Sequence, residues 1–205
     1  SNFCNGECKD AETTSMLRRQ LGSDPHDPHE YDNLPYKPGG CDPSEKTLSM
    51  SAYFPSTDEF QDRTWKEFNT HSLWNLYEAK ATNEFFVKKL DRRAFVLTRS
   101  NFPGSGLFTS KWLGDNFSSW EYMRYSIIGI YNFQMFGIAL TGSDMCGFMD
   151  NPQEELCARW MQLGAFYPFS RNHNADNAKD QEPYVFGERV MMASRSAIRQ
   201  KYSIS

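Results

Sequence analysis

Apolar residues recur at steps of three and four between residues 72 and 90, a spacing typical of a helix with one buried face. The residues before this segment contain six of the ten prolines and several turn-forming dipeptides. We therefore predict a long loop excursion over residues 1–70, followed over residues 71–205 by regular helices and strands.

Three short apolar runs follow the predicted helix, at residues 94–97, 138–141 and 165–169. Their length and composition predict buried strands. Polar side chains stand at the exit of each run, where Arg99, Asp144 and His173 are found. The chemistry of the protein is expected at these strand exits.

Helix signals separate the predicted strands. Ser118 or Ser119 is suited to cap a helix that carries Glu121 in its first turn. The dipeptide Asn151-Pro152 is expected to open a further helix, with Asn as N-cap and Pro as the first helical residue, extending to about Leu163.

Strand and helix thus alternate three times, which favours a parallel α/β sheet. Polar residues at the carboxyl ends of parallel strands suit a TIM barrel, whose active sites lie on that face. Three or four strands cannot close a barrel, so we predict the later half of a (β/α)8 barrel that carries the long N-terminal loop excursion.

Composition excludes several classes of function. The net charge of −4 and the scattered basic residues make nucleic acid an unsuitable partner, and no phosphate-binding glycine loop is present. The stretch between Arg124 and Asp144 has no charged residue and nearly the length of a membrane span, but Asn132, Gln134 and Gly137 interrupt it. A helix followed by a buried strand explains the stretch better, so no membrane span is expected.

The run Asp24-Pro-His-Asp-Pro-His-Glu30 contains two imidazoles and three carboxylates. Such side chains suit either a metal site or an ordinary loop. The prolines splay the side chains and no cysteine is interleaved, so no metal ligand is predicted here.

Trp112 and Asp115 lie three residues apart after the first predicted strand. An aromatic face covers the apolar side of a sugar ring, and a carboxyl group shielded by an aromatic ring keeps its proton more easily, as a general acid needs. Taken alone, the pair is equally compatible with a core Trp and a solvated loop Asp.

Several long motifs, in one order, resemble glycoside hydrolase family 31 from about Asn69 to the C-terminus, and among its members the lysosomal and digestive α-glucosidases most closely. The motifs are residues 93–100 with 111–116, 141–148, 155–169, 171–174 and 181–184. The resemblance implies a TIM barrel, an α-glucoside substrate and no metal or organic cofactor. It implies a retaining double displacement, in which one carboxyl group attacks the sugar and a second acts as acid and then as base.

By the same resemblance, Asp115 is the acid/base. Arg99 and His173 are similar to donors to the sugar hydroxyls, Trp112 and Phe148 to walls of the pocket, and Asp144 to a carboxylate that orients them. Each residue also has a structural explanation, since Arg99 suits a structural ion pair, and Phe148 and His173 suit core positions. Their joint occurrence at strand exits favours the site.

The two ends resemble interior parts of family motifs. Ser1-Asn-Phe3 is similar to the tail of the nucleophile motif, so the nucleophilic aspartate is expected before residue 1, and the segment 194–202 is similar to the start of a helix that continues past Ser205. We therefore expect a fragment that is inactive alone and whose partner is the remainder of the barrel, in the same polypeptide or in a processed chain.

Cys146 and Cys157 match a pair that is disulfide-bonded in secretory members of the family, which implies an oxidising compartment, lysosomal or extracellular. Cys8 and Cys41 are candidates to pair across the long loop, and Cys4 is left over.

Asn116-Phe-Ser118 forms a glycosylation sequon beside the proposed acid, and we expect it to be unmodified. Lys111 stands where most members have His, which leaves linkage preference open.

Two alternatives remain open beside the α-glucosidase. One is another family-31 activity, such as an α-xylosidase or a transglucosidase, and the other is a non-catalytic sugar-binding relative. The sequence leaves the pH optimum, the oligomeric state and the choice between lysosome and secretion undecided.

Overall fold

A computed structural model describes residues 31–32, 47–54 and 65–204 of the chain. The chain divides into two compact units, residues 1–75 and 76–205. Each unit is described separately below.

The first unit contains a short antiparallel pair of strands, β1 (Tyr53–Phe54) and β2 (Trp65–Lys66), followed by α2 (Glu67–Thr70) and the 3-10 turn η4 (His71–Leu73). Glu67 is buried, and its carboxylate accepts a hydrogen bond from Trp74 Nε1 (3.2 Å) and lies 2.8 Å from His71 Nδ1. The described part of the predicted loop region therefore includes short regular elements.

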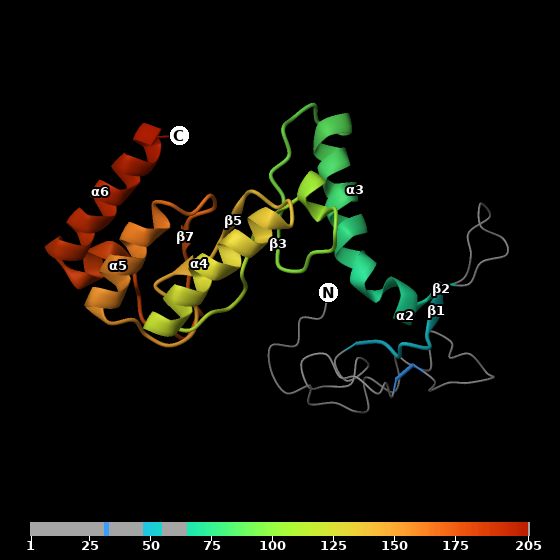
Figure 1. Cartoon of the computed structure of the whole chain (residues 1–205), viewed down its shortest axis with the longest axis horizontal. Helices are drawn as coiled ribbons and strands as arrows, with labels where there is room; N and C mark the ends of the chain where they lie inside the picture. The colour runs from blue at the N-terminus through green and yellow to red at the C-terminus, as the bar shows by residue number, and fades with distance from the viewer. Residues whose placement is uncertain (1–30, 33–46, 55–64, 205) are drawn as a thin grey trace. The chain divides into compact units, whose positions relative to one another are not determined.

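The second unit alternates helices and strands (Figure 1). The helix α3 (Trp74–Lys89) leads into it. In chain order the elements that follow are β3 (Leu97–Thr98), η5 (Ser105–Leu107), β4 (Ser110–Trp112), α4 (Trp120–Met135), β5 (Thr141–Gly142), β6 (Asp144–Met145), α5 (Glu154–Gly164), β7 (Arg171–Asn172), η6 (Pro183–Phe186) and α6 (Glu188–Ile204).

All strand pairs of the second unit are parallel. β4 lies between β3 and β5, and β6 pairs with β7. Only Ser143 separates β5 from β6, and the Phe169 N–H, just before β7, donates to Thr141 O of β5 (3.2 Å). Four segments therefore run side by side in chain order, and the predicted parallel α/β class is confirmed.

Gly142 permits one of these close approaches. A Cβ added at this position would lie 1.9 Å from Phe169 O, so any other residue would push the last segment away from β5. The glycine is therefore required where the three-stranded sheet β3-β4-β5 meets the segment that leads into β7.

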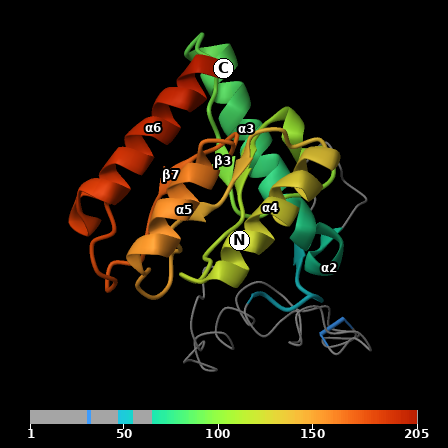
Figure 2. The ribbon, with the colours of Figure 1, turned by 60° about the vertical axis from the view of Figure 1, so that its left-hand side comes forward.

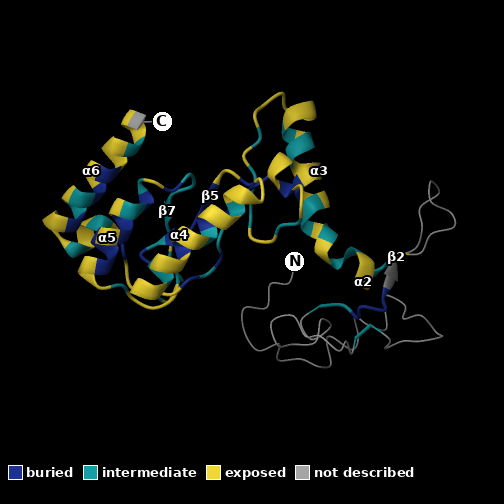
Figure 3. Cartoon of the chain, in the orientation of Figure 1, coloured by how far each residue is buried: buried dark blue, intermediate teal, exposed yellow. Residues whose placement is uncertain are grey.

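The core of the second unit lies between α4, α5 and the strands. Ile130 of α4 packs with Leu156 and Trp160 of α5 and with Tyr167. Tyr167 accepts a hydrogen bond from Trp160 Nε1 (3.0 Å) and also contacts Ser126 Oγ of α4. Helices α5 and α6 lie side by side (Figure 2), and the buried residues gather on α5 and the strand segments (Figure 3).

The predicted helix at residues 72–90 is confirmed as α3, but its predicted buried face is wrong. Within α3 only Ala79 is buried, whereas Tyr77 and Phe85 are 61% and 53% exposed. Within the second unit, α3 contacts the segment before β4 through a polar side chain, since the Asn83 amide donates to Phe108 O (3.1 Å).

The predicted cap of α4 is confirmed, and that of α5 is wrong. Ser119 Oγ accepts from the Tyr122 N–H (3.2 Å), and α4 begins at the next residue. α5 begins at Glu154 with Gln153 as N-cap. Asn151 serves a different purpose, because its Oδ1 accepts from the Lys179 N–H (2.7 Å) and holds the loop after β7.

Strand positions differ from prediction by up to several residues. The runs at 94–97 and 138–141 overlap the observed β3 and β5, which lie further along the chain, and β4 was missed. The predicted strand at 165–169 is wrong, because those residues form a turn in which the Tyr167 N–H donates to Gly164 O and Ser170 Oγ to both Gly164 O and Tyr167 O. Tyr167 is buried there as part of the core, which explains the apolar run.

Among the described residues, no helix has the length and apolar character that crossing a membrane requires.

Candidate active site

The carboxyl ends of the parallel strands gather all six predicted site residues. Arg99 follows β3, Trp112 ends β4, and Asp115 comes three residues later. Asp144 begins β6, whose following loop carries Phe148, and His173 follows β7. The order of the strands places these residues at a single edge of the sheet.

Asp115 and Arg99 form an ion pair between the exits of neighbouring strands. Arg99 Nη1 lies 3.6 Å from Asp115 Oδ2, and the side chains are 49% and 20% exposed. Gly114, with φ of 85°, supports this approach, because a Cβ there would lie 3.2 Å from Arg99 Nε.

Asp144 is the buried charge of the site. Its carboxylate is 0% exposed, and Oδ1 accepts two hydrogen bonds from Arg171, from Nε (3.1 Å) and from Nη2 (2.7 Å). Burial raises the pKa of Asp144, and the Arg171 guanidinium opposes that rise. A fork-shaped donor of this kind is what a desolvated carboxylate requires.

Arg171 also stacks on the aromatic part of the site. Its guanidinium carbon lies 5.4 Å from the Trp112 ring centroid and 5.6 Å from that of Phe169. Trp112 Nε1 and Asp144 Oδ2 are buried without a hydrogen-bond partner among the described residues. The site thus retains one donor and one acceptor with unused bonding capacity.

Phe148 and His173 form the next contact of the site. Their ring centroids lie 5.1 Å apart with an interplanar angle of 40°. The loop after β6 therefore meets the exit of β7 through an aromatic ring and an imidazole.

Asn116 connects the loop that carries Asp115 to the loop that follows β6. The side chain is 6% exposed, and its Nδ2 donates to Ser143 Oγ (2.8 Å) and to Asp144 O (3.0 Å). Its Oδ1 accepts from the Phe148 N–H (2.9 Å). Sequence reasoning treated this residue only as a glycosylation acceptor.

Lys111 lies behind the site, between β4 and α4. It is 7% exposed, its Nζ donates to Arg99 O, and the ammonium lies 4.5 Å from the Phe133 ring centroid. Burial, with a contribution from the Arg99 charge, lowers the pKa of Lys111 to about 8.

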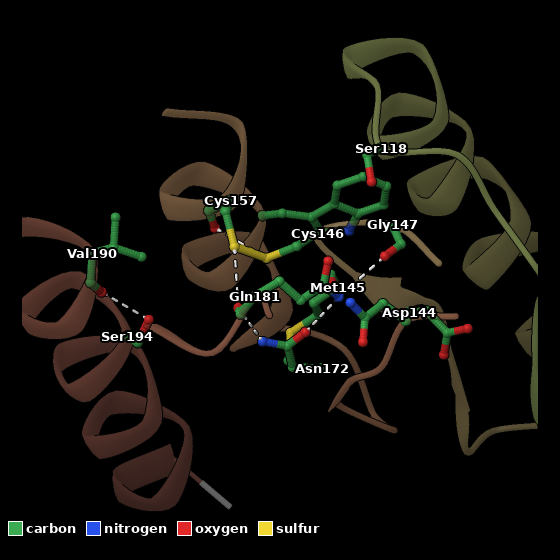
Figure 4. The surroundings of a disulfide bond; sticks show 12 residues. Ser118, Asp144, Met145, Cys146, Gly147, Cys157, Asn172, Gln181, Val190 and Ser194 are labelled. Atoms are coloured by element: carbon green, nitrogen blue, oxygen red, sulfur yellow. Dashed lines mark hydrogen bonds between the residues drawn. A yellow bond between two sulfur atoms is a disulfide. The ribbon is translucent and has the colours of Figure 1, made fainter. Parts of the chain in front are cut away.

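The Cys146–Cys157 disulfide ties the loop after β6 to α5 (Figure 4). Beside it, Gln181 Nε2 donates to Gly147 O (3.1 Å) and to Asn172 Oδ1 (2.7 Å), and Asn172 Nδ2 donates back to Gln181 O (2.8 Å). The disulfide and the two amides together fix the loop that carries Phe148 relative to β7.

Comparison with known proteins agrees with this geometry. The sequence profile of the "Glycosyl hydrolases family 31 TIM-barrel domain" matches residues 1–204. The chain belongs to glycoside hydrolase family 31. The predicted family is therefore confirmed.

Among curated relatives of this family-31 chain, the lysosomal acid alpha-glucosidase of Tetrahymena pyriformis is 38% identical over 100% of the chain and 24% of the relative. Human intestinal sucrase-isomaltase is 40% identical over 100% of the chain and 10% of the relative. The chain thus spans about a quarter or less of the length of these two relatives.

Solved structures show a similar arrangement. The alpha-glucosidase of Bacteroides thetaiotaomicron, titled as a family-31 enzyme, superposes with a TM-score of 0.63 at 34% identity, over 72% of this chain and 25% of that one. The glucosidase II alpha subunit bound to alpha3-Glc2 gives a TM-score of 0.69 at 32% identity, over 78% of this chain and 17% of that one.

Two residues of the candidate site, Arg171 and Asn116, were not among the site residues predicted from the sequence. Arg171 opens the quoted 171–174 motif, and its position at a strand exit was the available signal. Asn116 ends the motif at residues 111–116, but its burial and its three side-chain partners depend on the loop after β6.

Some predictions concern residues outside the described part of the chain. These predictions concern the run at residues 24–30, where no metal ligand is predicted, and the cysteines at positions 4, 8 and 41. Among the residues described, no cluster of three or more His, Cys, Asp or Glu side chains is arranged to hold a metal ion.

The buried amide leads to a prediction about the sequon. Asn116 is expected to be unglycosylated, because its Nδ2 is occupied by two hydrogen bonds in a buried position. Enzymatic deglycosylation in heavy-oxygen water followed by peptide mass spectrometry tests this. Conversion of Asn116 to labelled aspartate would contradict it.

The lowered pKa of Lys111 predicts how stability varies with pH. Between pH 8 and 10.5 the unfolded chain keeps a proton that the native chain has released, so raising the pH stabilises the native state. The stability of the native protein relative to a Lys111→Met variant should therefore increase across this range, by at most about 3 kcal/mol.

The experiment uses the longest natural polypeptide that contains this sequence, hereafter called the parent polypeptide. Thermal unfolding of the parent polypeptide and of its Lys111→Met variant at several pH values measures this difference in stability. Lys89→Met, at an exposed position on α3, corrects for the loss of one cation. A stability difference that stays constant from neutral pH to pH 10.5 would refute the prediction.

Proposed function

We propose that this chain supplies the acid/base half of the active site of a retaining exo-α-glucosidase, which removes terminal glucose from maltose-type oligosaccharides, glycogen or starch. The observation that carries the proposal is the Asp115 carboxylate at the exit of β4, in an ion pair with Arg99 and beside the Trp112–Arg171–Asp144 cluster. A positioned carboxyl group on this face of a parallel α/β domain suits acid catalysis on a glycoside.

In the proposed reaction, Asp115 donates its proton to the glycosidic oxygen as the bond to the anomeric carbon breaks. Arg99 then stabilises the carboxylate that remains, since its guanidinium lies 3.6 Å away. In the second step Asp115 takes a proton from water as water attacks the glycosyl-enzyme. The attacking nucleophile is proposed to be an aspartate upstream of residue 1, in the earlier half of the barrel.

The remaining site residues are proposed to hold the sugar. Trp112 and Phe148 provide aromatic faces for the ring, and Arg99 and His173 provide donors for its hydroxyls. Asp144 orients Arg171, which stacks on Trp112. Trp112 Nε1 and Asp144 Oδ2 are buried without a hydrogen-bond partner among the described residues, which supports binding of a ligand rich in hydroxyl groups.

The proposed location is the secretory pathway, in a lysosome or outside the cell. Two observations support it: the disulfide between Cys146 and Cys157, and the relatives named lysosomal alpha-glucosidases.

The central test is an Asp115→Ala variant of the parent polypeptide. Its kcat/KM for maltose should fall by about 10²–10⁴-fold, the usual contribution of a general acid and base. Azide needs no general base, so it should restore turnover on an activated glucoside and yield α-glucosyl azide. Asp176→Asn, an exposed carboxylate in the loop after β7, is the matched control and should remain active.

The stereochemistry separates the alternatives. Proton NMR of the first turnovers of the unmodified parent should show α-glucose before mutarotation. β-Glucose as first product would refute retention, and faster cleavage of α-xylosides would favour an α-xylosidase. Binding of glucose without hydrolysis of any α-glucoside would indicate a sugar-binding relative.

Linkage preference is expected to respond to Lys111. Lys111→His should change the ratio of maltose to isomaltose hydrolysis by a few-fold and leave retention intact, because Lys111 Nζ holds the carbonyl of Arg99 and so sets the Arg99–Asp115 geometry. The two kcat/KM values, measured in the parent polypeptide and in the variant, test this. An unchanged ratio would count against the idea.

A further inference from the structure

Asp115 lies between a glycine with left-handed backbone geometry and a buried asparagine. Gly114 precedes it with φ of 85°, in a region of backbone space where glycine turns at little cost. Asn116 follows it and is buried. On its carboxyl-terminal side Asp115 is therefore held by a buried, hydrogen-bonded residue, in addition to the ion pair that its side chain forms with Arg99.

Asn116 is held by both its side chain and its backbone. The amide donates to Ser143 Oγ and Asp144 O, and Oδ1 accepts from the Phe148 N–H. The backbone oxygen of Asn116 accepts from the Phe148 N–H (2.9 Å) and the Met149 N–H (2.8 Å). All of these bonds run to residues 143–149, and the Phe148 N–H is shared by the two oxygens of Asn116.

The partners of Asn116 are themselves rigidly placed. Ser143 is buried between β5 and β6, and Asp144 is fixed by its pair with Arg171. Gly147 allows the two loops to touch, because a Cβ there would lie 2.5 Å from Ser118 Cα. The Asn116 side chain is therefore attached to a part of the sheet that does not depend on the Asp115 loop.

We infer that Asn116 is a positioning residue for the acid/base, which holds the Asp115 carboxyl group in line with the glycosidic oxygen by anchoring its loop to Ser143, Asp144 and Phe148. This inference rests on the proposed role of Asp115. Asn116 acts through Asp115 and touches neither the substrate nor the reacting atoms.

Positioning of an acid has a kinetic signature that general destabilisation lacks. Maltose needs proton transfer to its leaving oxygen, whereas fluoride leaves α-glucosyl fluoride with far less assistance. A misdirected Asp115 therefore slows maltose cleavage much more than fluoride release. A damaged pocket or a partly unfolded protein slows both reactions by the same factor.

The test variant is Asn116→Ala in the parent polypeptide. It removes the three side-chain bonds and keeps the backbone carbonyl that accepts from Phe148 and Met149. We expect kcat/KM to fall about 100-fold for maltose, the loss that a misplacement of about 1 Å causes. For α-glucosyl fluoride the fall should be no more than about 3-fold, because little proton transfer is needed.

Ser118→Ala is the matched control. It removes the same sequon, together with one bond of the same loop, from Ser118 Oγ to Met149 O (2.9 Å), and leaves every Asn116 bond in place. It should lower kcat/KM slightly, and by the same factor for both substrates. Any effect due to a lost glycan would appear in both variants.

The outcomes separate this inference from the proposed function. An equal loss on both substrates in Asn116→Ala would overturn the positioning role, even where Asp115→Ala shows the expected acid/base behaviour. A parent polypeptide that cleaves neither substrate would refute the proposed function itself, and with it the role of Asn116. A selective loss on maltose in Asn116→Ala, absent in Ser118→Ala, would support the inference.

Discussion

The ion pair between Asp144 and Arg171 is the interaction on which the rest of the site depends. A carboxylate that is 0% exposed is costly to keep charged, and a single forked donor from the neighbouring strand offsets that cost. Removing one partner of such a pair typically costs about 3–5 kcal/mol. The pair joins β6 to β7 and fixes both Arg171 over Trp112 and the backbone oxygen of Asp144.

The Asp144–Arg171 pair connects to the rest of the site on two sides. Towards β4, the Asp144 oxygen accepts from Asn116, which stands next to Asp115. Towards β7, the loop after β6 is held by the Cys146–Cys157 disulfide and by Gln181, so that Phe148 meets His173. The residues of the site thus share one framework, although they come from four strand exits.

Sequence alone was sufficient for the parts of this framework that are local. The existence of α3, the Ser119 cap of α4 and the polar exits of β3 and β5 follow from spacing and residue type. It failed where partners from elsewhere decide the outcome. The Asn151 side chain holds the Lys179 backbone and so does not cap α5, and the apolar run at 165–169 is core packing around Tyr167 in a turn.

The same distinction between local and long-range determinants explains which site residues could be predicted. Arg99 and Asp144 were predicted as site residues because they follow apolar runs and match family motifs, and Asp115 because of its spacing to Trp112 and its family motif. Arg171 was part of a motif, but its pairing with Asp144 depends on the register between β6 and β7. The partners of Asn116 lie around a turn in which Cys146 and Gly147 have positive φ, and the spacing of apolar residues does not predict such a turn.

Burial of the Asn116 side chain constrains the order of folding and glycosylation. In a secretory compartment a sequon is open to the glycosylation machinery while the chain is unfolded, and closed once Asn116 enters its slot beside Ser143. A sugar attached early would be too large for that slot and would keep the two loops apart. In the proposed secretory compartment, the loop after β4 must therefore dock before Asn116 is glycosylated if the chain is to fold.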